Sequence, residues 1–446
     1  MEPDSSSRSP DRSVERSMEY LERARRVIPG GAQTNAKSPS QFVQGVSPTH
    51  AVRAEGSRFW DVDGNEYVDY LMTCGPVILG YDHPRVDEAV RSQLEEGQAF
   101  SVPHPLQVEV AETIIELVPC AEMVRFGKNG NDVTALSAKL ARAYTGRDVI
   151  ATAGYHGWPN VFLSASASAR GIPDVVGEYT ERFGYNDLDA ARQIFEDHPD
   201  DVAAIITTPA SSETPEDGFL EGLRDLANDH GALLIFDEVF TGFRYALGGA
   251  QEYFGVTPDL ACFAKAMANG FPISALAGDR EVMRTLEEPD VTFSMTYAGE
   301  AMSLAAANAC LDSLRSNERS IYDRIFTVGD AIREGINDLA EDHGVDDRVS
   351  AYGIAPRIAT RFTDDNGEND RELKSLFLQE AHKRGVFGTG SHLPSAAHTD
   401  EDVRFTLEVY DEVLSILADA VVNDDAADRL EGKPVGSTIR QQTGVE

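Results

Sequence analysis

The chain has 446 residues, of which 41% are hydrophobic, and this length predicts two or three domains with sizeable cores. Its 75 acidic residues against 39 basic ones give a net charge of -36, which disfavours nucleic acid and anionic membranes as partners. No run of about 18 apolar residues and no N-terminal signal-peptide pattern is visible, so the expected compartment is the cytoplasm.

The acidic residues are spread along the whole chain, whereas lysine is scarce, with only seven residues. This pattern indicates a surface adapted to high salt, where counterions screen like charges; an ordinary acidic enzyme is the alternative. The four cysteines are scattered without a CxxC pair, and the ten histidines lack the spacing of metal ligands. Neither a disulfide framework nor a metal site is therefore predicted.

The N-terminal region divides into a tail and a structured segment. Residues 1–17 are polar and predict a disordered tail, and residues 18–75 form the N-terminal segment. Within this segment, apolar spacing over 18–27 predicts a helix that ends at Pro29-Gly-Gly31. A β-hairpin is predicted around Asp63-Gly-Asn65, because this turn sequence separates two β patterns.

Strands alternate with helices over residues 76–309, the predicted large domain. Such alternation is typical of an α/β fold with a mostly parallel central sheet, which binds ligands at the carboxyl ends of its strands. The expected strands are 123–126, 149–153, 202–207, 233–237 and 260–264, and the expected helices are 108–117, 133–144 and 220–228.

Residues 310–430 form a predicted smaller α+β domain at the C-terminal end. Helical patterns cover 301–312, 321–339, 372–384 and 413–422, and a strand pattern covers 357–362. The remaining residues, 431–446, are polar and predict a flexible tail.

The ends of two predicted strands carry unusual side chains. Leu233-Leu-Ile-Phe-Asp-Glu-Val239 is an apolar run that breaks into two carboxylates, and Lys265 directly follows the run 260–264. A buried lysine readily becomes a nucleophile towards carbonyls, and a buried carboxylate keeps a ring nitrogen protonated. Pyridoxal phosphate (PLP) needs this pair, so Lys265 and Asp237 are the predicted catalytic residues. The alternative is two unrelated strand ends with solvated charges.

Two loops predict the remaining parts of a cofactor site. Lys128-Asn-Gly-Asn131 lies between a strand and a helix, where backbone N–H groups and the helix dipole attract phosphate. Tyr155-His-Gly157 follows the strand 149–153, and its rings suit stacking on a flat cofactor. Each signal alone also fits an ordinary helix start or surface loop. Together with Asp237 and Lys265 they lie at the carboxyl ends of one predicted sheet, which predicts a PLP enzyme.

Three central stretches carry a family resemblance: Leu234–Arg244, Ala246–Gln251 and Phe254–Leu260. They resemble class III PLP-dependent aminotransferases, most of all the glutamate-1-semialdehyde 2,1-aminomutase branch, and the resemblance covers roughly residues 18 to 425. It implies PLP-dependent transferase fold type I, a homodimer with active sites at the subunit interface, and a mobile N-terminal segment that closes over the substrate.

The resemblance also implies a cofactor-binding set: Asn129, Gly130, Asn131, Tyr155, His156, Asp237, Val239, Lys265 and Thr296. Lys265 would form the Schiff base and move the proton, while Asp237 would pair with the pyridinium nitrogen. Val239 would pack beneath the ring, and Tyr155 would stack on it with His156 beside. The turn 129–131 would hold the phosphate, and Thr296 would reach the phosphate of the partner subunit.

The residues around the substrate depart from the aminomutase pattern. The arginine for the substrate carboxylate aligns with Lys37, which keeps the charge but lacks the bidentate geometry of a guanidinium. The phosphate turn reads Asn129-Gly-Asn-Asp132 in place of Ser-Gly-Thr-Glu, and a Glu-Pro-Val strand end reads Thr208-Pro-Ala210. A glutamate expected near the C-terminal end is replaced within Gly388–His392.

The expected function is a PLP-dependent aminotransferase that moves an amino group from a small amino donor to an aldehyde or keto acceptor. The Gly-Lys-Asn-Gly turn and Gly299-Glu300 support it, because they resemble aminomutase-like aminotransferases, some tied to sugar or surface-polysaccharide pathways. The alternative is glutamate-1-semialdehyde 2,1-aminomutase, which uses the same chemistry within one molecule to give 5-aminolevulinate. A non-catalytic protein of this fold is a third reading, against which the intact Lys265 and Asp237 argue.

Overall fold

The computed structural model describes residues 12–437, which form two compact units. Within that range, unit 1 combines residues 12–83 with 323–437, and unit 2 comprises residues 84–322. The N-terminal segment, predicted as a separate part of the chain over 18–75, therefore clusters with the C-terminal region.

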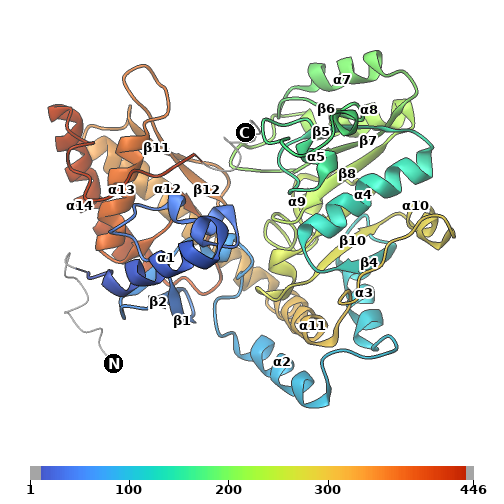
Figure 1. The fold of residues 1–446 in the computed structure, drawn as a ribbon, viewed down its shortest axis with the longest axis horizontal. Coiled ribbons are helices and arrows are strands. Elements are labelled where there is room, and N and C mark those ends of the chain that lie inside the picture. The colour runs from blue at the N-terminus through green and yellow to red at the C-terminus, as the bar shows by residue number, and fades with distance from the viewer. Residues whose placement is uncertain (1–11, 438–446) are drawn as a thin grey trace. The chain divides into compact units, whose positions relative to one another are not determined.

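A seven-stranded sheet lies at the centre of unit 2 (Figure 1). Its order is β4-β10-β9-β8-β7-β5-β6, and all neighbouring strands are parallel except the two pairs made by β10. The mostly parallel α/β sheet is therefore confirmed. The strands are β4 (Met123–Gly127), β5 (Val149–Ala153), β6 (Thr180–Arg182), β7 (Val202–Thr207), β8 (Leu233–Glu238), β9 (Leu260–Phe263) and β10 (Ser274–Gly278).

Helices cover both faces of this sheet because its central strands are apolar on both sides. On one face, Ile205 and Leu234 pack against the helices α7 and α8. On the other face, Ile206 and Ile235 pack against α4 and α10. Strands buried along their whole length are the pattern that a covered parallel sheet requires. These helices are α4 (Gly130–Thr145), α7 (Leu188–Asp197), α8 (Phe219–His230) and α10 (Arg280–Arg284).

The helix α11 (Ala301–Ser316) connects several other parts of unit 2. It packs against α2 (Pro84–Glu96), α3 (Leu106–Leu117) and the 3-10 helix η6 (Lys265–Ala268). Short helical turns complete the unit: α5 (Asn160–Leu163), α6 (Asp174–Gly177), α9 (Ala250–Phe254) and η7 (Thr285–Glu287).

Unit 1 contains two small sheets. The predicted hairpin is present, with β2 (Arg58–Asp61) antiparallel to β3 (Glu66–Asp69). β3 also pairs in parallel with β13 (Val386–Phe387), far away in the sequence, and this pairing joins the N-terminal segment to the C-terminal region. The remaining strands are β1 (Ala51–Glu55) in the first sheet, and β11 (Val349–Tyr352), β12 (Ile358–Phe362) and β14 (Ser391–His392) in the second.

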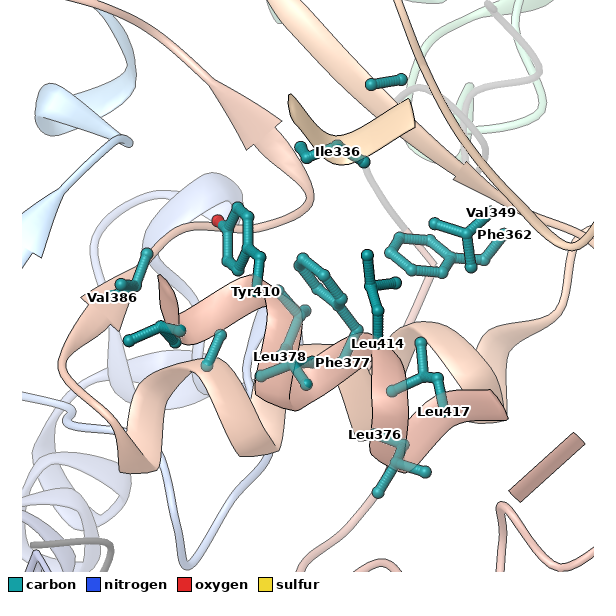
Figure 2. Packing of buried hydrophobic residues seen from close by; sticks show 14 of the residues in the cluster. Ile336, Val349, Phe362, Leu376, Phe377, Leu378, Val386, Tyr410, Leu414 and Leu417 are labelled. Atoms are coloured by element: carbon teal, nitrogen blue, oxygen red, sulfur yellow. The ribbon is translucent and has the colours of Figure 1, made fainter. Parts of the chain in front are cut away.

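Long helices supply the core of unit 1, which Figure 2 shows from close by. Phe377 of α13 faces Tyr410 of α14, with ring centroids 4.9 Å apart, and Leu414 lies in the same cluster. Phe362 of β12 stacks obliquely on Phe377 at 5.1 Å. The helices of the unit are α1 (Glu15–Val27), α12 (Glu318–Asp342, which begins in unit 2), α13 (Arg371–Lys383) and α14 (Asp400–Asn423), with the short turns η2 (Pro29–Gly31), η3 (Asn35–Lys37), η4 (Pro39–Gln41) and η5 (Met72–Cys74).

The ends of the chain differ from the expectation of two loose tails. α1 begins at Glu15, inside the predicted tail 1–17, because the backbone N–H groups of Arg16 and Ser17 bind the carboxylate of Asp63. At the other end, Val435 is buried and donates its N–H to Ser375 Oγ at 3.0 Å. Residues 1–11 and 438–446 lie outside the described range. Among residues 12–437, no helix is long and apolar enough to cross a membrane.

Candidate active site

The parallel strands of unit 2 end at one edge of the sheet, and a cavity of about 310 Å³ lies there. Loops after β4, β5, β7, β8 and β9 all contribute to its wall. Predicted cofactor residues supply most of the lining: Asn129, Gly130, Asn131, Tyr155, His156, Asp237, Val239 and Lys265. The structure thus brings together eight of the nine residues in that set.

Asp237 and His156 form a buried pair on the cavity wall. His156 Nδ1 lies 2.7 Å from Asp237 Oδ2, and the imidazole is fully buried. The other ring nitrogen, Nε2, lies 3.0 Å from the carbonyl oxygen of Ala153, which can only accept a hydrogen bond. These two contacts hold the imidazole between the Asp237 carboxylate and the backbone at the end of β5. His156 therefore orients the carboxylate, in addition to lining the cavity.

Lys265 enters the cavity from the first residue of η6, directly after β9. Its backbone has φ of +45°, a left-handed conformation that costs a non-glycine residue about 1 kcal/mol or more. Its Nζ lies 5.0 Å from the centroid of the Phe240 ring, which also lines the cavity. A strained backbone and an aromatic contact aim the amine at the space that Asp237 borders.

The helix α4 provides the anion-binding end of the cavity. The first N–H groups of a helix have no partner within the helix, and the helix dipole favours a negative charge there. The carboxylate of Asp132 accepts the N–H groups of Lys128 and Asn129, at 3.0 and 2.7 Å. The N–H groups of Gly130 and Asn131, both on the cavity wall, are thus the ones available for a phosphate.

Close packing explains the glycine at position 130. A Cβ atom built there would lie 2.9 Å from a methyl carbon of Val239, a distance that Cβ atoms do not tolerate. The residue without a side chain therefore lets the helix start approach the strand end that carries Asp237. A lysine amine, a carboxylate and an anion-binding helix start around one cavity are the groups that PLP requires, so the residues fit this cofactor.

Four cavity residues were not in the predicted set: Thr134, Gly157, Thr208 and Phe240. Thr134 Oγ1 donates to the carbonyl oxygen of His156 at 3.0 Å, which ties the loop 155–157 to α4. Thr208 stands at a departure from the family pattern, where the resemblance implies a glutamate, and this departure is the sequence signal for it. Phe240 lies two residues after the end of β8, where an apolar aromatic residue suggests core packing.

Glu238, next to Asp237 in the sequence, does not line the cavity; its side chain is surrounded by other parts of the protein. Burial raises the pKa of this carboxyl, although Ala250 N, Gln251 and Thr241 Oγ1 donate hydrogen bonds to it. The side chain is fully buried and fastens the loop that follows β8. The two consecutive acids therefore have different tasks.

The last two predicted residues lie apart from this lining. Thr296 is exposed in the segment that precedes α11, and it does not line the cavity. Lys37 is exposed at the end of η3 in unit 1. The roles inferred for them remain predictions.

A mostly parallel sheet of this order, with the lysine and the aspartate at strand ends around one cavity, defines a PLP-dependent enzyme of fold type I. The chain belongs to the class III aminotransferase family, because the model of that family, Aminotransferase class-III, matches residues 42–421. The predicted family, enzyme class and PLP cofactor are thereby confirmed.

Similar proteins include aminotransferases and an aminomutase. The 3-aminobutyryl-CoA aminotransferase of Cloacimonas acidaminovorans is 37% identical over 90% of this chain and 97% of its own length. The glutamate-1-semialdehyde 2,1-aminomutase 2 of an Exiguobacterium species is 36% identical over 88% of this chain and 95% of its own length.

Solved structures agree with the fold. The PLP internal aldimine form of the FumI protein of Sphingopyxis sp. MTA144 superposes with a TM-score of 0.84 and 32% identity, covering 94% of this chain and 99% of that one. An omega-transaminase from Sphaerobacter thermophilus gives 0.81 and 27%, covering 90% and 97%. Predicted fold type I is confirmed.

Proposed function

We propose that this protein is an aminotransferase that releases an oxo acid and aminates a separate carbonyl acceptor, as opposed to an aminomutase. One observation carries this preference: Lys37 stands where the aminomutase pattern has an arginine. A guanidinium grips a carboxylate with two parallel hydrogen bonds, whereas an ammonium binds it as a point charge. Weaker binding of the substrate carboxylate favours release of the oxo acid, whereas an aminomutase must retain its intermediate.

The side chains of the cavity have separate tasks in this reaction. PLP, when bound, supplies an electron-withdrawing ring that stabilises negative charge on the substrate carbon. Asp237, oriented by His156, would keep the ring nitrogen of the cofactor protonated. Lys265 Nζ, which lines the cavity, would bind the aldehyde of the cofactor and would be the group that moves the proton at the reacting carbon. Tyr155 and Val239 would contact the cofactor ring, and the N–H groups of Gly130 and Asn131 would hold its phosphate.

We further propose that two copies of the chain assemble with shared active sites. Thr296 lies exposed outside the lining of its own cavity, which suits a residue that reaches the phosphate of the partner subunit. The net charge of -36 supports function in the cytoplasm of a high-salt cell, where counterions screen the acidic surface. Size measured in solution at high and low salt tests both parts of this proposal.

The aminomutase is the second candidate because a relative that is 36% identical bears that name. A half-reaction on the purified protein in high salt separates the two. Candidate amino donors, 3-aminobutyryl-CoA and glutamate-1-semialdehyde among them, are added singly while the visible absorbance of the bound cofactor is followed. Loss of the band with release of an oxo acid identifies an aminotransferase and its donor.

Conversion of glutamate-1-semialdehyde to 5-aminolevulinate, with no oxo acid from any donor, would establish the aminomutase. Lys37→Arg is the matched variant for this assay, since it restores the family side chain without changing charge. It should raise the aminomutase activity relative to transamination.

A further inference from the structure

Lys128 precedes the turn 129–131 but does not line the cavity. Its Nζ donates to Glu300 Oε1 at 2.7 Å and to Ser303 Oγ at 3.1 Å. The two charged side chains are only 18% and 15% exposed. Because water screens such a pair poorly, the contact is stronger than an ion pair on the open surface. The lysine next to the turn is therefore committed to another element.

Glu300 belongs to that other element, the start of α11. Its Oε2 accepts Met302 N at 2.8 Å and its Oε1 accepts Ser303 N at 3.0 Å, so it caps the helix. Burial acts to raise the pKa of Glu300, but hydrogen bonds from Lys128 and Ser303 outweigh it and hold that pKa below its ordinary value. The carboxylate is thus ionised and binds the lysine and the helix end together.

The helix α11 also supports the segment that bears Lys265. Cys310 Sγ donates to the carbonyl oxygen of Ala266 at 3.3 Å, and α11 packs against η6. On its other side, the turn is fixed by Asp132, which accepts the N–H groups of Lys128 and Asn129. The lysine–glutamate contact therefore links the two parts of the cavity that hold the phosphate and the reactive amine.

We propose that the Lys128–Glu300 pair is a positioning element that holds the turn 129–131 against the start of α11, and that Lys128 is not itself a phosphate ligand. This inference rests on the proposed placement of the phosphate at Gly130 and Asn131. A lysine so close to a phosphate site has an obvious alternative role, direct electrostatic attraction. The two roles predict opposite effects of one substitution.

Glu300→Gln separates the roles by sign. If Lys128 attracts the phosphate, removal of the opposing carboxylate leaves its charge uncompensated and tightens PLP binding. If the pair positions the turn, the same substitution loosens the turn and weakens PLP binding. Lys128→Met weakens PLP binding under either role, so it measures how much Lys128 contributes to affinity but does not distinguish the two roles.

The experiment titrates PLP into the apoenzyme and measures the dissociation constant by absorbance. We expect a rise of about tenfold for Lys128→Met and for Glu300→Gln, the value of one partly buried charge contact. The double variant should be little worse than either single one, because both remove the same contact. The ³¹P resonance of bound PLP should shift in both variants, and Lys128→Arg should restore most of the affinity.

Lys139→Met is the matched control, because Lys139 lies on α4, the helix that follows the turn, and donates to Thr292 O, away from the cavity lining. It should leave PLP affinity unchanged, and thermal melting of each apoenzyme checks that the variants fold. Tighter binding by Glu300→Gln, or unchanged binding by both single variants, would overturn the inference. Gly130→Ala, whose Cβ would meet Val239, tests the phosphate placement: unchanged affinity there refutes the placement itself.

Discussion

Two regions of the molecule bury histidines, and they differ in what those histidines contact. In unit 2, His156 faces the carboxylate of Asp237 beside the cavity. In unit 1, His392 contacts the hydroxyl of Tyr410 at 2.6 Å, and His398 contacts Ser395 Oγ at 2.9 Å. The side chains of His392 and His398 are buried, with 1% of each residue's surface exposed.

The difference shows that a shifted pKa alone does not mark a site. Burial lowers the pKa of His392 to about 3 and that of His398 to about 4. Burial outweighs the nearby Asp402 carboxylate, which acts to raise the pKa of His398, and the Tyr70 ring stacks on that imidazole. The candidate active site of unit 2 is instead recognised because its histidine contacts a carboxylate that borders a cavity. The predictions below test whether that contrast holds.

Removal of the reactive amine gives the largest expected effect. Lys265→Ala should lower turnover by about 10⁴-fold, because no other group of the cavity lining can bond the cofactor aldehyde. The variant should still fold, because the lysine side chain extends into a cavity and an alanine at this position is compatible with the buried residues around it. Steady-state kinetics and thermal melting measure both; turnover above a trace would contradict the assignment.

Asp237→Ala should lower turnover by about 10²–10³-fold, because the ring nitrogen would lose the group that keeps it protonated. The visible absorbance of bound PLP should change as well. Asp69→Asn is the matched control in unit 1: Asp69 is also buried and accepts Leu71 N, Met72 N and the Tyr81 hydroxyl. It should lower stability while leaving that absorbance unchanged, and equal spectra for wild type and Asp237→Ala would refute the pairing.

Sequence patterns predicted the sheet of unit 2 well because its strands are continuous apolar runs bounded by turns. The strands 149–153 and 202–207 have the predicted bounds. β10 was missed, since Ser274–Gly278 consists of small residues and runs antiparallel between β4 and β9. The membership of the N-terminal segment was missed for another reason: the pairing of Val68 with Val386 depends on residues distant in sequence.

The site residues were predictable where a charged side chain follows an apolar strand pattern, as with Asp237 and Lys265. The contact between His156 and Asp237 was not, because it joins a loop to a strand about 80 residues away in the sequence. The sequence placed His156 beside the ring, whereas its nitrogen atoms reach the acid and a backbone carbonyl. The partner of Lys128 was hidden in the same way, at the start of α11.

The buried imidazoles of His392 and His398 should make unit 1 sensitive to acid. An unfolded histidine titrates near 6.5, whereas folded His392 and His398 titrate near 3 and 4, so below pH 6.5 the unfolded state binds more protons. The free energy of unfolding should therefore fall with pH from about 6.5 towards 4, by up to about 1.4 kcal/mol per pH unit for each histidine. Tyr70, Tyr410, Asp402 and Arg324 are the other titratable groups around them.

Denaturant unfolding at several pH values measures this slope. The chain has two tryptophans, Trp60 in unit 1 and Trp158 in unit 2, so Trp158→Phe leaves a reporter of unit 1 alone. In that background, His392→Gln should reduce the pH dependence of the unfolding free energy between pH 6 and 5 by about 1.4 kcal/mol per pH unit, which corresponds to the uptake of about one proton. An unchanged slope would mean that His392 titrates alike in both states, and the contrast between the two regions would weaken.

The smallest expected effect tests whether unit 1 is only structural. Lys37 is exposed on η3 and matches the family position for the substrate carboxylate. Lys37→Met should raise the KM of a carboxylate substrate about tenfold, the loss of one charge-assisted contact, with little change in kcat. Lys37→Arg should keep or lower KM, and Lys433→Met, at another lysine of unit 1, is the matched control. If Lys37→Met leaves KM unchanged, substrate recognition does not involve Lys37, and the preference for an aminotransferase loses the observation that carries it.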